Sequence, residues 1–227
     1  MEWYSKEVTR PVKTAPRTKR SHINAVGTRA HIIESARTLF IRDGYAPTTL
    51  AKIAAEAGVV SQTVYNAVGN KAAVLMAVFE RVISGPQAPR SVPEFMRERV
   101  GAASSPQEVV SVLAAWFVEA HRRTGRLWQV IAEAGTHDPE MQAFARTLAH
   151  RRLRNYGEAA EDLARRGAPG RGLDPEGVAA VIWSIGHPQV FQTLVVESGW
   201  SHERYRKWVR AALLAAVGLS VGRASSE

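Results

Sequence analysis

Residues 61–66 combine small hydroxyl side chains with carboxamides, the groups that proteins use to recognise base edges in DNA. A Gln or Asn side chain can pair with adenine through two hydrogen bonds, and Ser and Thr are small enough to approach a base pair without a clash. We therefore expect this segment to contact bases if a helix presents it to the major groove. The four candidates are Ser61, Gln62, Thr63 and Asn66.

The surrounding pattern predicts the helices that would present this segment. Apolar residues recur at helical spacing over 28–43 and indicate a first helix. Thr48 is expected to cap a second helix of about nine residues, Ser61 to cap a very short third one, and Asn70 to begin a fourth. A short helix, a glycine-containing turn and another short helix are typical of a helix-turn-helix, and the alternative is a plain three-helix bundle.

This stretch, residues 28–82, resembles the N-terminal domain of the tetracycline-repressor (TetR) family of bacterial regulators. The resemblance covers all four expected helices and the turns between them. The residues that carry it are Ala36, Leu39, Phe40, Gly44, Tyr45, Thr48, Ile53, Ala54, Ala57, Gly58, Val59, Ser61, Thr63, Val64, Tyr65 and Lys71.

The resemblance implies a transcriptional regulator in which residues 61–66 read bases and other side chains hold phosphates. We expect phosphate contacts from Thr48, Tyr65 and Lys71, because a hydroxyl, a phenol and an ammonium group at a helix start all suit a phosphate oxygen. The sequence departs from the family pattern at Ala67 and Val68, where larger side chains are usual. One phosphate contact is therefore expected to be missing.

The charge of the chain favours a polyanionic partner. Its formal net charge is +9, and residues 1–27 hold six basic and two acidic side chains with almost no apolar periodicity. We expect residues 1–27 to be a disordered basic arm, which either follows a DNA groove or is simply a solvated start of the chain.

The remainder of the chain is expected to be helical throughout, so the fold class is all-α. Domain boundaries are expected at 28–72 for the helix-turn-helix DNA-binding domain and at 73–221 for a helical effector-binding and dimerisation domain. A proline-rich connection spans 84–105. The helices expected after it cover 105–123, 126–134, 138–166, 174–198 and 201–220.

Aromatic residues spaced along these helices could converge on a pocket for a small apolar or aromatic ligand. Gly186-His187-Pro188 would kink one helix and leave the carbonyl of Ser184 free, and kinks can line cavities. The alternative for each side chain is an ordinary place in the core. The candidate ligand-binding residues are Trp116, Phe117, His121, Trp128, Met141, Phe144, Trp183, His187 and Phe191.

The last two helices are expected to form a homodimer. One helix-turn-helix contacts only a few base pairs, so useful specificity usually needs two copies related by a two-fold axis. Apolar side chains available for that contact are Trp183, Leu194, Trp208, Leu213 and Val217. The alternative is that they only close the core of the monomer.

Several other classes of protein are disfavoured. With no cysteine, thiolate chemistry is excluded, and the seven histidines show no metal-binding spacing, so we expect no metal and no cofactor. Phosphate-binding loops and nucleophile elbows are missing, which argues against an enzyme. No leader and no spanning helix is expected, so a cytoplasmic location is predicted. The function favoured is a repressor released from a palindromic operator by its ligand, and the alternative is a constitutive or architectural DNA-binding protein.

Overall fold

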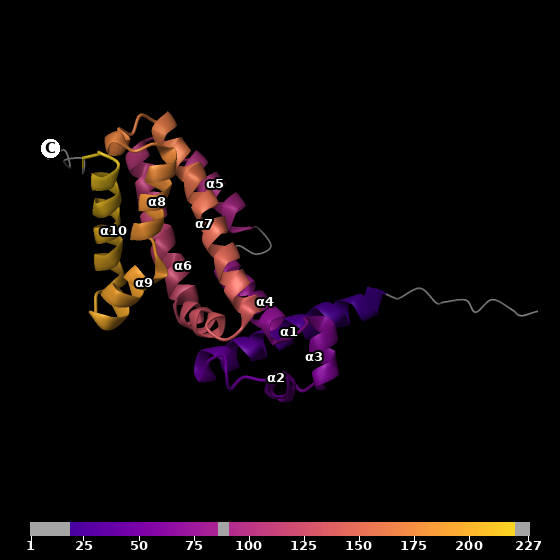
Figure 1. Ribbon diagram of the computed structural model, residues 1–227. Coiled ribbons are helices and arrows are strands. Elements are labelled where there is room, and N and C mark those ends of the chain that lie inside the picture. The colour runs from indigo at the N-terminus through magenta and orange to yellow at the C-terminus, as the bar shows by residue number, and fades with distance from the viewer. Residues whose placement is uncertain (1–18, 86–90, 221–227) are drawn as a thin grey trace, which may run out of the picture.

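The computed structural model describes residues 19–85 and 91–220, and in these ranges the chain is helical with no strand (Figure 1). The predicted all-α class is therefore confirmed. The first four helices form a small unit, in which α2 and α3 lie on the side of α1 that faces away from the long helices (Figure 1). They are α1 (Lys19–Asp43), α2 (Leu50–Glu56), α3 (Ser61–Ala67) and α4 (Lys71–Ser84).

Helix α1 is longer than the sequence pattern predicts. It begins at Lys19 rather than at Thr28, so the expectation that all of residues 1–27 are disordered is wrong for 19–27. The helix can extend over this stretch because residues 19–27 contain no proline. Each residue that is added to an existing helix also forms one more backbone hydrogen bond. Residues 1–18 of the expected basic arm lie outside the described residues.

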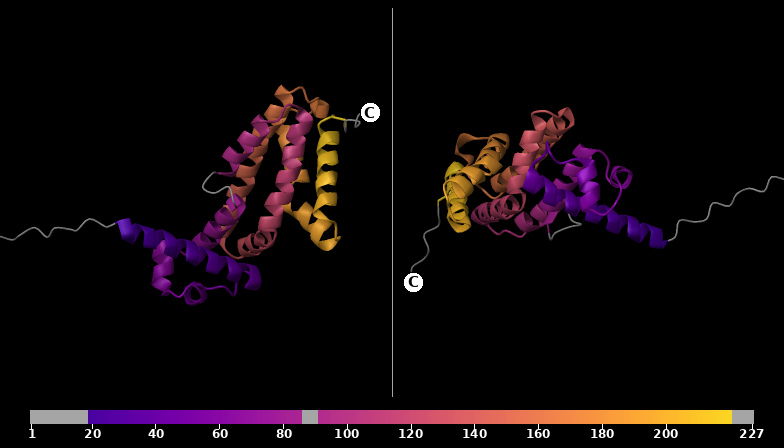
Figure 2. Two further views of the ribbon diagram at one scale, coloured as in Figure 1. Left: turned by 180° about the vertical axis from the view of Figure 1, so that it is seen from behind. Right: turned by 90° about the horizontal axis from the view of Figure 1, so that it is seen from below.

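The other helices form an elongated bundle that stands on this unit (Figures 1 and 2). Helix α4 joins the two parts, since it packs against α1 and also against α6 and α7. The remaining elements are α5 (Val92–Gly101), α6 (Pro106–Gly135), α7 (Pro139–Arg165), the short turn η2 (Gly170–Gly172), α8 (Pro175–Ile185), α9 (Pro188–Phe191), the π-helical turn η3 (Gln192–Glu197) and α10 (His202–Ala216).

Helix α6 runs without interruption through Thr124-Gly125, where the sequence predicts a helix end. Thr124 is completely buried, and its hydroxyl donates to the carbonyl of Ala120 at 2.7 Å, within the helix itself. Gly125 does not adopt a positive φ, so it does not act as a C-cap. A glycine inside a helix is tolerated when the residues before and after it are packed against the rest of the protein. Helix α6 has buried residues both before and after Gly125 in the chain.

The predicted kink at Gly186-His187-Pro188 is a complete break between α8 and α9, so the single helix expected over 174–198 is three short segments. Pro188 lacks the N–H that would bond to the carbonyl of Ser184. That carbonyl is not left free as expected, because it accepts the backbone N–H of His187 at 3.3 Å. The chain then turns toward α10, which it reaches after η3.

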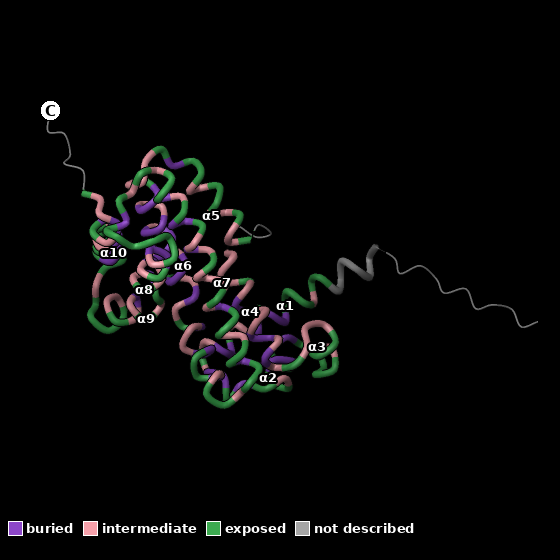
Figure 3. Tube along the Cα trace, turned by 45° about the horizontal axis from the view of Figure 1, so that its top comes forward, coloured by how far each residue is buried: buried purple, intermediate pink, exposed green. Residues whose placement is uncertain are grey.

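One apolar core extends from the small unit into the bundle, and a second fills the far end of the bundle. Figure 3 shows buried residues in both parts of the molecule. The first core joins Ile32 and Phe40 of α1 and Phe79 of α4 with Ile131 of α6 and Met141 of α7. The boundary predicted between residues 72 and 73 therefore lies at the start of a helix that belongs to both parts.

Replacing Gly125 by alanine tests the continuity of α6. A Cβ at this position would meet no other atom within 4 Å, and alanine loses less backbone entropy than glycine in a helix. Gly125→Ala should therefore raise the free energy of unfolding by about 0.5–1 kcal/mol, measured by urea denaturation. Gly44→Ala is the matched control, because Gly44 has a φ of +87° and should lose stability. A loss of stability in Gly125→Ala as well would show that the helix ends there.

Candidate DNA interface and ligand cavity

Helix α3 presents a polar face to solvent. Ser61, Gln62 and Asn66 are exposed and Thr63 is half-buried, while Val64 between them is completely buried in the core. The side-chain amide of Gln62 donates to the side-chain oxygen of Asn66 at 2.8 Å, which fixes the two carboxamides relative to each other. Gln62 keeps its acceptor oxygen and Asn66 keeps its amide donors, so the pair presents one acceptor beside one donor.

The start of α3 differs from the prediction in one detail. Ser61 is the first helical residue and not the cap, because Val60 occupies the N-cap position and makes no side-chain capping bond. The hydroxyl of Ser61 is therefore not engaged in capping. It is exposed in the first turn, which is the end of a recognition helix that usually contacts bases.

Thr48 cannot contact a phosphate, which corrects the sequence prediction. Its side chain is completely buried, and its hydroxyl donates to the carbonyl of Gly44 at 2.8 Å. The turn from Tyr45 to Thr48 points that hydroxyl back toward the end of α1. The N-cap of α2 is the next residue, Thr49, whose hydroxyl accepts the backbone N–H of Lys52 at 3.2 Å and which is exposed.

The two other predicted phosphate contacts differ in exposure. Tyr65 is 57% exposed at the end of α3. Lys71 is half-buried: its ammonium lies 4.0 Å from the centre of the Tyr45 ring and donates to the carbonyl of Ala46 at 3.2 Å. Burial lowers the pKa of Lys71, and the charge of Asp138 opposes that shift. Lys71 therefore holds the turn before α2 in place.

A polar junction ties the helix-turn-helix unit to the start of α7. The hydroxyl of Tyr45 donates to a carboxylate oxygen of Asp138 at 2.5 Å, and the amide of Asn70 donates to Glu140 at 2.9 Å. Asp138 is also the N-cap of α7, where it accepts the backbone N–H of Glu140 at 3.0 Å and that of Met141 at 3.3 Å. The hydrogen bond from Tyr45 is the main cause of the lowered pKa of Asp138.

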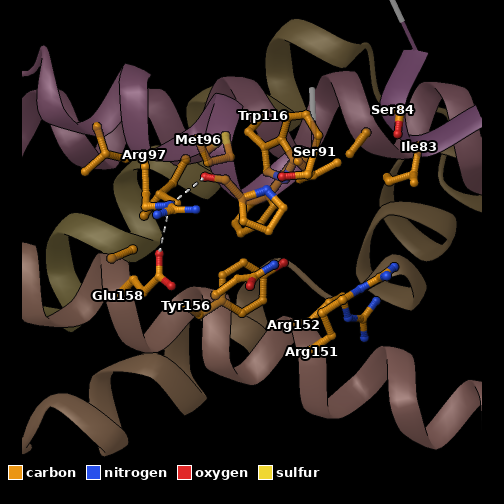
Figure 4. A pocket seen from close by; sticks show the side chains of 18 of the residues that line it. Ile83, Ser84, Ser91, Met96, Arg97, Trp116, Arg151, Arg152, Tyr156 and Glu158 are labelled. Atoms are coloured by element: carbon orange, nitrogen blue, oxygen red, sulfur yellow. Dashed lines mark hydrogen bonds and ion pairs between the residues drawn. The ribbon is translucent and has the colours of Figure 1, made fainter. Parts of the chain in front are cut away.

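A cavity of about 780 Å³ lies among α4, α5, α6 and α7. Four predicted ligand-binding residues line it: Trp116, Phe117, His121 and Trp128, all on α6. In Figure 4, Trp116 and Met96 on one side face Tyr156, Arg151 and Arg152 on the other. The volume is within the range of cavities that hold small organic molecules.

The other five predicted ligand-binding residues do not line this cavity. Met141 and Phe144 of α7 belong to the first core, beside Phe79. Trp183 lies on α8, before the break at Gly186, and its ring centre is 5.8 Å from the guanidinium carbon of Arg152, whereas His187 and Phe191 follow the break. Phe191 packs against Tyr205 of α10, with ring centres 5.1 Å apart. His187 caps α9, since its Nδ1 accepts the backbone N–H of Gln189 at 3.2 Å.

The sequence analysis missed the cavity residues that come from α4, α5 and α7. The clearest signal is on α7, where residues three or four positions apart share one face and Leu148, Arg152 and Tyr156 follow one another at that spacing. The missed residues include Phe79, Ile83, Met96, Val100, Leu148, Arg152, Asn155 and Tyr156.

His121 joins α6 to the break between α8 and α9. Its Nε2–H donates to the carbonyl of Gly186 at 3.0 Å, so this ring carries its proton on Nε2. Gly186 is required at this contact, because a Cβ there would lie 2.2 Å from Cζ of Phe117. The ring of His121 is buried, and its Nδ1 has no hydrogen-bond partner among the described residues. Burial lowers its pKa to about 4, and the charges of Arg152 and His187 act in the same direction.

The lowered pKa of His121 predicts a pH dependence of stability. The unfolded chain takes up a proton near pH 6.5, whereas the folded chain does so only near pH 4, so lowering the pH between these values favours the unfolded state. The free energy of unfolding should fall by up to about 1.4 kcal/mol per pH unit from this residue. His121→Gln should lose that part of the slope, measured by urea denaturation between pH 7 and about 4. Identical slopes in both proteins would contradict the prediction.

The geometry defines a class of protein: a helix-turn-helix protein in which the reading helix is carried by a helical body with an internal cavity. Within the described residues, no helix is long and apolar enough to cross a membrane, and no three His, Asp or Glu side chains are grouped as a metal site would need.

Comparison with known proteins finds a family model that matches the helix-turn-helix unit. Residues 32–78 match the sequence model of bacterial regulatory proteins of the tetR family. That match covers the helix-turn-helix unit, which is therefore similar to that of the TetR family of bacterial regulatory proteins. No curated protein matches the chain at a significant level.

Solved structures share the fold over most of the chain. A TetR-family transcriptional regulator of Mesorhizobium loti is 19% identical, with a TM-score of 0.66 over 86% of this chain and 96% of its own. NalD of Pseudomonas aeruginosa, the secondary repressor of the MexAB-OprM multidrug efflux pump, is 17% identical, with a TM-score of 0.65 over 85% and 97%. SmeT in complex with triclosan is 21% identical, with a TM-score of 0.65 over 84% and 91%.

Proposed function

We propose that the protein is a sequence-specific transcriptional regulator that binds a palindromic DNA operator as a homodimer and is released from it by a small organic ligand. The observation that carries the DNA-binding part is the exposed polar face of α3. Its carboxamide pair, Gln62 and Asn66, is held by a hydrogen bond in a geometry that offers an acceptor and a donor together. Adenine presents the complementary donor and acceptor in the major groove.

The remaining contacts to DNA would position this helix. We assign phosphate contacts to Tyr65 and to Thr49, which replaces Thr48 because its exposed hydroxyl stands at the N-terminus of α2. Lys71 acts less directly, by supporting the turn before α2 through its contacts with Tyr45 and Ala46.

A second copy of the chain is proposed to bind along α8 and α10. Leu213 and Val217 are buried within the monomer, so they are not available for that contact. Exposed residues on these helices include small side chains, which allow helices to approach closely, and one indole that is 37% exposed. This surface consists of Ala180, Ser184, Trp208, Ala211 and Ala215.

Substitutions on α3 separate base recognition from phosphate binding. Gln62→Ala should weaken binding to the operator by about 1–3 kcal/mol and bind non-operator DNA almost as before, because base contacts carry the specificity. Tyr65→Phe should weaken binding to both DNAs alike. The operator can be located by footprinting the DNA upstream of the protein's own gene, and affinities measured by fluorescence anisotropy.

The control is Arg146→Gln, on an exposed position of α7 in the bundle, which should leave both affinities unchanged. If Gln62→Ala lowers the two affinities equally, α3 does not read the sequence. That outcome would favour the alternative of an architectural DNA-binding protein.

Ligand control is supported by the way the cavity wall is shared with the DNA-binding unit. Phe79 lines the cavity and also belongs to the first core, and Trp128 packs edge-on against it with ring centres 4.7 Å apart. A ligand that displaces Trp128 would therefore act directly on α4. Release of DNA then needs only that the ligand binds better to a conformation in which the two reading helices are misplaced.

A variant with a filled cavity tests this coupling. Met96 faces the cavity from α5, away from the α3 surface. Met96→Trp should lower the affinity for a releasing compound at least about tenfold, because the added volume clashes with it, and should leave the affinity for DNA without ligand unchanged. Operator release by a panel of small organic compounds is read out by fluorescence anisotropy. Release that is equally efficient in Met96→Trp would place the ligand site elsewhere.

A further inference from the structure

The arginines that line the cavity are not equivalent. Three of the four have a carboxylate partner, whereas Arg152 has no ion pair with any described residue. The three pairs are Arg97 with Glu158 at 3.8 Å, Arg151 with Glu80 at 2.8 Å, and Arg165 with Asp162 at 2.7 Å. Among the described residues, the cavity therefore contains one guanidinium, that of Arg152, with no direct carboxylate partner, although Glu161 also belongs to the lining.

The surroundings of Arg152 are aromatic rather than acidic. Its guanidinium carbon lies 4.7 Å from the ring centre of Trp128 and 5.8 Å from that of Trp183. Its Nε is buried and has no hydrogen-bond partner among the described residues. Burial lowers the pKa of Arg152. Ring faces attract a cation but accept no strong hydrogen bond, so they compensate only in part for the lost water.

The position of Arg152 makes it available to a ligand. It lies on the face of α7 that lines the cavity, one helical turn before Tyr156, and Figure 4 shows both side chains extending from α7 among the residues that line the cavity. The Tyr156 ring is buried with the other aromatic side chains of this wall. A molecule in the cavity would thus meet aromatic side chains beside one guanidinium that has no carboxylate partner, whereas the other three arginines of the lining are paired.

We infer that the cavity binds an organic monoanion, an apolar or aromatic body that carries one carboxylate, and that Arg152 pairs with that carboxylate. This inference rests on the proposed ligand control and specifies the ligand for it. A carboxylate suits a guanidinium because two parallel N–H···O bonds can form. A dianion such as a phosphate monoester is disfavoured, because the other three cavity arginines are already paired and its second charge would stay unbalanced.

Matched acid and alcohol pairs test this inference in the full-length protein. The probes are naphthoate and naphthalenemethanol, decanoate and decanol, and indoleacetate and indole-ethanol. Binding is measured by calorimetry and by quenching of tryptophan fluorescence. For at least one pair, the wild-type protein should bind the acid roughly tenfold to hundredfold more tightly than the alcohol.

Two substitutions assign that preference to one residue. Arg152→Met should remove it and leave the affinity for the alcohol almost unchanged. Arg151→Met is the matched control on the adjacent position, and it should keep the preference because Arg151 already pairs with Glu80. Equal binding of acid and alcohol by the wild type, no binding of any acid, or a preference that persists in Arg152→Met would overturn the inference.

Stability without ligand gives a second, independent measurement. Because Arg152 is partly buried and has no carboxylate partner, Arg152→Met should not lower the melting temperature of the ligand-free protein, whereas a purely structural role would lower it. Arg152→Gln, which also lacks the charge, should give the same loss of preference if the methionine variant does not fold. If an alcohol binds in the cavity and releases DNA with the same efficiency as the matching acid, only the inferred charge of the ligand is overturned. If the probes bind without changing the affinity for DNA, the proposed ligand control is overturned.

Discussion

The packing of Phe79 is the contact that joins the helix-turn-helix unit to the cavity, and the proposed ligand control depends on it. Its ring meets Trp128 of α6 at 4.7 Å and Phe144 of α7 at 6.1 Å, both edge-on. The same side chain lies in the core that holds α1 and α4 together and in the wall of the cavity. Closely packed aromatic side chains have few alternative arrangements, so a displaced ring moves its neighbours. The helix-turn-helix unit and the cavity therefore cannot repack independently.

Local signals in the sequence determine where most helices begin. Asn70, Asp138 and Ser201 were predicted to start helices, and each is an N-cap whose side chain accepts a backbone N–H of the first turn. Such a cap is visible in sequence because it depends only on the next three residues. Helix ends were harder to predict. Thr124-Gly125 has the composition of a helix end, yet burial of α6 on both sides of this point keeps the helix intact.

The candidate site was predictable where it depends on one helix and not where it depends on several. The four aromatic residues on α6 line one cavity because helical spacing alone puts them on one face. Trp183, His187 and Phe191 were placed there by assuming a kinked helix, but none of them lines the cavity: Trp183 precedes the complete break at Gly186, and His187 and Phe191 follow it. Thr48 and Thr49 show the same limit at one turn: their chemistry is identical, and only the fold of the turn decides which hydroxyl is buried.

Helix α7 would connect the proposed charged ligand directly to the helix-turn-helix unit. It begins at Asp138, which caps the helix and accepts the hydroxyl of Tyr45, and it carries Arg152 fourteen positions later, about 21 Å along its axis. A carboxylate held by Arg152 pulls on a rigid helix whose first turn is bonded to the reading unit. A neutral ligand of the same shape could press only on the aromatic wall. A charged ligand can therefore favour one position of α7 through an attraction that depends on direction, and differential binding of this kind is what shifts a conformational equilibrium.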